Sequence, residues 1–85
     1  MQDRSDPAHN AGATEQLRRC IGDNIRQAQL CQGMSLADLG HALAIAEVVV
    51  ANYEAGLEKV SPMMLCKIAV TLDTTLGSLF GMPGL

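Results

Sequence analysis

The amino-acid sequence predicts an all-α fold class, and three observations support that prediction. Hydrophobic residues make up 48% of the 85 residues, whereas aromatic residues make up only 2%, so aliphatic side chains must fill the core, as is typical of helical bundles. Apolar residues recur at the spacing of one helix face, and helix-capping residues precede several of these stretches. The short chain has room for one modest core and therefore one domain.

The first expected helix follows a polar segment at the start of the chain. Residues 1–13 show no apolar period, so we expect them to form a flexible N-terminal arm. A helix is expected from Thr14, a candidate N-cap, to Gly33, which would end it in the left-handed conformation. Its inward residues would be Leu17, Ile21, Ile25 and Ala28.

Two short helices are expected next. Ser35 and Asp38 have the spacing of a capping box variant, in which both side chains satisfy backbone amides at a helix start. A helix is therefore expected over residues 35–43 and another over residues 47–54, ended by Gly56. The inward residues would be Leu39 and Leu43 in the first helix and Val50 and Tyr53 in the second.

The C-terminal third of the chain predicts two more helices. Ser61 followed by Pro62 places an N-cap before a first-turn proline, and Thr75 is a candidate cap for a last short helix. The apolar stripe of the first of these helices would be Leu65, Ile68, Ala69 and Leu72, and the last short helix would carry Leu76, Leu79 and Phe80. The domain is thus expected over residues 14–80, with a C-terminal tail over residues 81–85.

The second and third expected helices meet the requirements of a helix-turn-helix motif. This motif needs close contact between its helices, a tight turn and an apolar plug. Gly40 stands where a small residue is needed, Ala44 falls at the turn, and Val50 and Tyr53 are the expected plugs. The alternative is that Gly40 is only a flexible helix residue, at a cost of about 1 kcal/mol relative to alanine.

Four sequence patterns follow one another between residues 21 and 80: I-x-x-x-I-R, G-M-S-L-A-D-L-G-H-A-L, N-Y-E-A-G and S-P-x-x-L-x-x-I-A-x-x-L-D-T-T-L-x-x-L-F. Together they resemble the lambda-repressor-like, or XRE, family of helix-turn-helix regulators. The resemblance implies a compact five-helix domain whose helix-turn-helix is formed by helices 2 and 3. It also implies a transcriptional regulator that binds palindromic operator DNA as a homodimer.

The same resemblance implies which residues would contact a partner. The groove-facing residues of the third helix would be Glu47, Val48, Val49, Ala51 and Asn52. Ser35 and Leu36 would approach a phosphate, and Lys59 would be the only cation near the expected DNA face.

These residues depart from the chemistry that DNA reading requires. Only Asn52 could make a bidentate contact with a base, and Glu47 would repel phosphates. The formal net charge of −3 is also opposite to the basic footprint of DNA-binding proteins. Gln29 replaces an arginine that many relatives pair with the glutamate at the position of Glu54.

Two functions are compatible with this pattern. An exposed apolar patch would be formed by Leu36, Val48, Val49 and Ala51. Such patches mark protein interfaces, which favours a regulator that acts mainly through a regulatory protein partner, as an antiactivator or co-regulator. The alternative is a homodimeric sequence-specific DNA-binding repressor that uses Asn52, Lys59, valine contacts to thymine methyl groups and the arginines of the first helix. Pairing within a homodimer could also bury the valines.

Other functional classes lack their characteristic residues. The sequence has no phosphate-binding glycine loop, nucleophile elbow or metal-spaced histidine pair, so we expect neither an enzyme nor a cofactor or metal site. The three cysteines form no C-x-x-C pair, and Cys31 and Cys66 are expected to be small core residues. No signal peptide or membrane-span pattern is found. The expectation is a cytoplasmic protein with no membrane contact and no small-molecule ligand.

Overall fold

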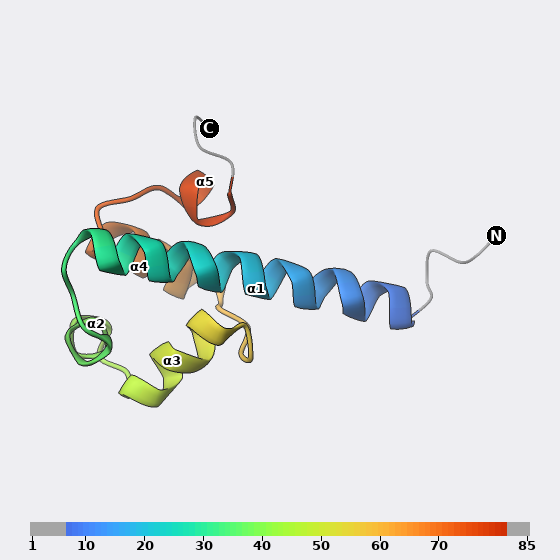
Figure 1. Ribbon diagram of the computed structural model, residues 1–85, viewed down its shortest axis with the longest axis horizontal. Coiled ribbons are helices and arrows are strands. Elements are labelled where there is room, and N and C mark those ends of the chain that lie inside the picture. The colour runs from blue at the N-terminus through green and yellow to red at the C-terminus, as the bar shows by residue number, and fades with distance from the viewer. Residues whose placement is uncertain (1–6, 82–85) are drawn as a thin grey trace.

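A computed structural model describes residues 7–81, and this part of the chain forms five α-helices and no strand (Figure 1). The helices are α1 (Pro7–Cys31), α2 (Leu36–Leu43), α3 (Glu47–Ala55), α4 (Pro62–Thr71) and α5 (Leu76–Leu79). The long α1 crosses the molecule, with α2 and α3 on one side of it, α5 on the other and α4 behind. The predicted all-α class with five helices is confirmed.

The helix α1 begins earlier than the apolar pattern predicts. Its first residue is Pro7 rather than Thr14, and proline suits a first turn because its φ is already helical and its missing amide proton is not needed there. The added turns project beyond the other helices in Figure 1. Because no other described helix packs against them there, an apolar pattern is not required in this part of α1. The predicted helix start was therefore wrong. Residues 1–6 of the expected arm and residues 82–85 of the expected tail lie outside the described part of the chain.

One hydrophobic core joins all five helices. Its buried members are Ile21, Ile25, Leu39, Leu43, Val50, Tyr53, Val60, Leu65, Ile68, Ala69, Leu72 and Leu79. Most of the predicted inward residues are among them. The prediction for Leu17 was wrong, because this residue is 48% exposed. Helical spacing places a leucine on the inner face of a helix but does not show whether another helix covers that point.

The helices α1 to α4 end in the same backbone motif. After α1, the Met34 amide donates to the Gln29 carbonyl at 3.1 Å and the Gly33 amide donates to the Leu30 carbonyl at 3.0 Å, which is the Schellman pairing. The left-handed residues of the four motifs are Gly33, Ala44, Gly56 and Asp73, with φ of 68°, 60°, 74° and 54°. Gly33 ends α1 as predicted. Ala44, in the turn between α2 and α3, adopts a backbone conformation that a side chain disfavours.

The helices α1 and α3 touch through their backbones. Gly22 is buried in the middle of α1, where an added methyl group would collide with the carbonyl oxygens of Tyr53 and Glu54, the second at 2.6 Å. A methyl group on Gly56, just after α3, would lie 2.8 Å from Cγ of Arg19. A side chain at either position would push α3 away from α1.

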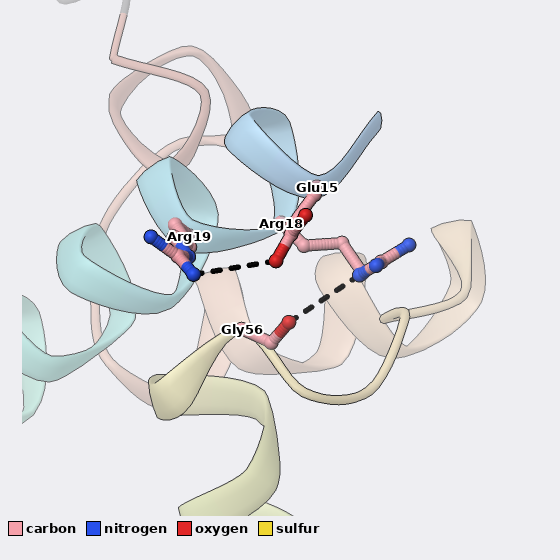
Figure 2. A network of polar contacts seen from close by, with 4 residues as sticks. All are labelled: Glu15, Arg18, Arg19 and Gly56. Atoms are coloured by element: carbon pink, nitrogen blue, oxygen red, sulfur yellow. Dashed lines mark hydrogen bonds and ion pairs between the residues drawn. The ribbon is translucent and has the colours of Figure 1, made fainter. Parts of the chain in front are cut away.

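Polar contacts reinforce this crossing (Figure 2). The Arg18 Nε donates to the Gly56 carbonyl at 3.3 Å, which satisfies an acceptor at the C-terminal end of α3. One residue further along α1, Arg19 pairs with Glu15 at 3.2 Å on the helix surface. The exposed pair adds little stability, whereas the Arg18 contact joins two elements.

The strained turn residue gives a stability prediction. Ala44→Gly should raise the free energy of unfolding by about 0.5–1 kcal/mol, because glycine adopts the left-handed conformation without the clash of a Cβ atom. The matched control is Gly33→Ala, where nothing lies within 4 Å of the added methyl group, so it should lower stability by a similar amount. Urea denaturation followed by circular dichroism measures both. A destabilised Ala44→Gly would contradict the assignment of strain to this residue.

Candidate functional site

The helices α2 and α3 form the predicted helix-turn-helix. The chain bends by 109° between them, within the range of about 90–120° for this motif. A capping box starts α2, since the Ser35 hydroxyl accepts from the Asp38 amide at 3.0 Å and the Asp38 carboxylate accepts from the Ser35 amide at 3.1 Å. The hydrogen bond that the Ser35 amide donates to this carboxylate, with a smaller contribution from the Ser35 hydroxyl, lowers the pKa of Asp38. The predicted capping box is confirmed.

The turn between these helices is packed as the sequence predicts. Gly40 is buried, and a methyl group there would lie 3.0 Å from the Ile45 carbonyl oxygen. The Ile45 amide donates to the Gly40 carbonyl at 2.9 Å. Val50 and Tyr53 are buried against the core. A small residue and two apolar plugs thus hold α3 against α2.

The predicted contact residues differ in their exposure. Ser35, Glu47 and Lys59 are exposed, and the side chain of Val48 is 63% exposed. Ala51 and Asn52 are half-buried. Leu36 and Val49 are also half-buried and pack against the core. The apolar patch is therefore narrower than the sequence indicates, with Val48 as its most exposed member.

We define the α2–α3 face as the accessible residues Asp38, His41, Glu47, Val48, Ala51 and Asn52. This face is acidic. Residues 27–58 contain no lysine or arginine, so the two helices and the turn between them have no fixed positive charge. Exposed carboxylates are provided by Asp38 at the start of α2 and by Glu47 at the start of α3.

Two side-chain oxygens, one on α1 and one on α3, are buried without a partner among the described residues. They are Oε1 of Gln29 and Oε2 of Glu54. The side-chain amide of Gln29 donates through Nε2 to the Met34 carbonyl at 2.9 Å and thereby fixes the end of α1. Burial raises the pKa of Glu54, and the charge of Arg26 only partly opposes that shift. The glutamine at position 29 thus contributes no charge to balance Glu54.

The structure also shows the surroundings of the cysteines and of the other side chains that can bind metals. Cys20, Cys31 and Cys66 are all exposed, so the expectation that Cys31 and Cys66 are core residues was wrong. Cys31 is the last residue of α1, and Cys66 follows the buried Leu65 and faces outward. Within residues 7–81, no three His, Cys, Asp or Glu side chains are placed to hold a metal ion. In the same range, no single helix is long and apolar enough to cross a membrane.

Comparison with known proteins matches the chain to a solved structure. No family model matches the chain, and no curated protein matches it. Among solved structures, the restriction-modification controller protein C.AhdI from Aeromonas hydrophila superposes with a TM-score of 0.69 at 24% sequence identity. The match covers 73% of this chain and 94% of the controller protein. The two proteins share a fold.

The raised pKa of the Glu54 carboxyl group predicts a dependence of stability on pH. Because its pKa is raised above the ordinary value of 4.5 in the folded protein, folding takes up protons, and this group makes the protein less stable as pH rises through the raised value. Glu54→Gln removes the effect. The stability of the variant relative to the wild type should therefore increase as pH rises from the ordinary pKa of 4.5 toward the raised value. Urea denaturation across this range measures the difference, and a difference independent of pH would contradict the assignment.

Proposed function

We propose that this protein regulates transcription mainly through protein contact made by the α2–α3 face, as an antiactivator or co-regulator. The shared fold with a restriction-modification controller protein supports a regulatory function. The observation that carries the mode of action is the absence of lysine and arginine from residues 27–58, because a helix-turn-helix held on DNA needs cations beside the phosphates.

Electrostatics favours a protein partner over DNA. Each phosphate contact contributes about −0.9 to the slope of log affinity against log salt, and DNA-binding proteins that depend on phosphate contacts make about six to ten of them. The exposed Lys59 is the first cation after α3, and Asp38 and Glu47 lie on the α2–α3 face itself. Even a dimer would provide few phosphate contacts.

The α2–α3 face instead has the composition of a protein interface. Val48 provides an exposed apolar side chain, and Asp38 and Glu47 provide exposed carboxylates on the same two helices. Protein interfaces commonly combine apolar side chains with polar or charged ones. The exposed carboxylates complement a basic surface, such as the DNA-contacting surface of another regulator. Occupation of that surface would prevent the partner from binding its operator.

The second candidate function is a homodimeric sequence-specific DNA-binding repressor. It is favoured by the fold shared with the controller protein and by Asn52, whose amide suits an adenine edge. The arginines of α1 offer limited help, since the charge of Arg19 is paired with Glu15 and that of Arg26 interacts with Glu54. This function would depend on Asn52 and Lys59.

Transcript profiling of a deletion strain complemented with variants tests the proposal. Val48→Asp should reproduce the deletion profile, because a carboxylate cannot be buried unpaired in an interface. The matched control is Val70→Asp, since Val70 lies on α4 and is 82% exposed. It should behave like the wild type. A wild-type profile for Val48→Asp would remove the α2–α3 face from the mechanism.

A DNA-binding titration separates the two functions. The DNA is a duplex from the region upstream of the gene that encodes this protein. In fluorescence anisotropy at about 100 mM salt, the wild-type protein should show no saturable binding to it. Saturable binding that an unrelated duplex does not compete for, and that Asn52→Ala abolishes, would establish the DNA-binding repressor instead.

A further inference from the structure

A cavity lies on α1 outside the α2–α3 face. Its volume is about 240 Å³, and it lies between α1, the connection from α3 to α4, the start of α4 and Phe80. The apolar walls are Leu17, Ile21, Val60, Pro62, Leu65 and Phe80. The sequence gives no sign of it, because these residues come from separate segments of the chain.

The cavity has the size and lining of a site for a small apolar group. A cavity of about 150 Å³ lined by aliphatic and aromatic side chains holds one benzene molecule, so this one has room for a body somewhat larger than benzene. Ile21 and Leu65 form a buried floor, whereas Leu17 is 48% exposed at the edge. An occupant would cover this leucine and remove apolar surface from water.

The edge of the cavity carries two cations. Arg18 and Lys59 line it together with Glu58, so the formal charge at the edge is +1. Among the described contacts, the Arg18 side chain makes one hydrogen bond, from Nε to the Gly56 carbonyl. Its terminal nitrogens point away from Gly56 in Figure 2. They are available to a carboxylate, the partner that a guanidinium binds best.

We propose that this cavity binds a small organic monocarboxylate that has an aryl or alkyl body and about ten non-hydrogen atoms in all. The apolar body would lie between Leu17 and Phe80, and the carboxylate would lie beside Arg18 and Lys59. Glu58 selects against a second negative charge. Because Arg18 also holds the C-terminal carbonyl of α3, the ligand is joined through one side chain to the helix-turn-helix. The proposal does not depend on which macromolecule the α2–α3 face contacts.

Titration of the full chain, followed by amide nitrogen–proton NMR spectra, tests the proposal. The probes are 3-phenylpropanoate and octanoate, with 3-phenylpropan-1-ol as the uncharged control. Ligands of this size bind with a Kd of about 1 mM. The acids should cause saturable shifts at Leu17, Ile21, Val60 and Phe80, and the alcohol should bind about fivefold or more weakly, because it forms no charge-assisted hydrogen bond.

Matched variants on one helix locate the site. Leu17→Glu should weaken binding of both acids about tenfold or more by placing a like charge at the cavity edge. Leu30→Glu is the control, because Leu30 is 56% exposed on α1 and does not line the cavity, and it should bind as the wild type does. Lys59→Gln should weaken the acids but not the alcohol.

Three results would overturn the proposal. The first is the absence of a saturable shift from either acid up to about 10 mM, a concentration well above the expected Kd. The second is equal affinity for the acid and the alcohol. The third is that Leu17→Glu binds the acids as tightly as the wild type does. Each variant's own spectrum shows directly whether it is folded. A folded Leu17→Glu that binds normally therefore counts against the site.

Discussion

The contact between the backbones of α1 and α3 at Gly22 positions the rest of the molecule. Without a side chain at this point, α1 reaches the carbonyl oxygens at the end of α3, and Gly56 allows the same approach from the other side. Arg18 then bonds to the Gly56 carbonyl. Since α3 carries Glu47 and Val48 and is packed against α2, the position of the α2–α3 face follows from this crossing.

The scaffold of the helix-turn-helix and the chemistry of its surface lead to different conclusions. The capping box, the small residue in the turn and the two plugs are all present. These residues are needed to form the fold, whatever the surface of the motif binds. Apart from the amide of Asn52, the α2–α3 face carries carboxylates and a valine where DNA recognition needs cations and amides. Surface residues of a stable scaffold change at little cost in stability. The same fold can therefore present a protein-binding surface.

Local signals made much of the fold predictable. Capping residues and apolar spacing located α2, α3 and α4, and they identified Val50 and Tyr53 as plugs, because these features act within a few residues. Features that depend on distant segments were missed. The spacing of Leu17 matches that of a buried residue, but no helix covers it, and Gly22 reveals its role only when α3 is packed against it. The roles of Glu47 and Val48 stay predictions, since the fold determines their exposure and not their partner.

The measurement that tests the central crossing most directly is the stability of Gly22→Ala in urea denaturation. In an open helix this substitution would stabilise the protein by about 1 kcal/mol, because alanine is the better helix former. Here the added methyl group meets backbone that cannot move aside, so the variant should instead lose about 2 kcal/mol or more. A variant as stable as the wild type, or more stable, would show that the backbones of α1 and α3 do not meet at Gly22.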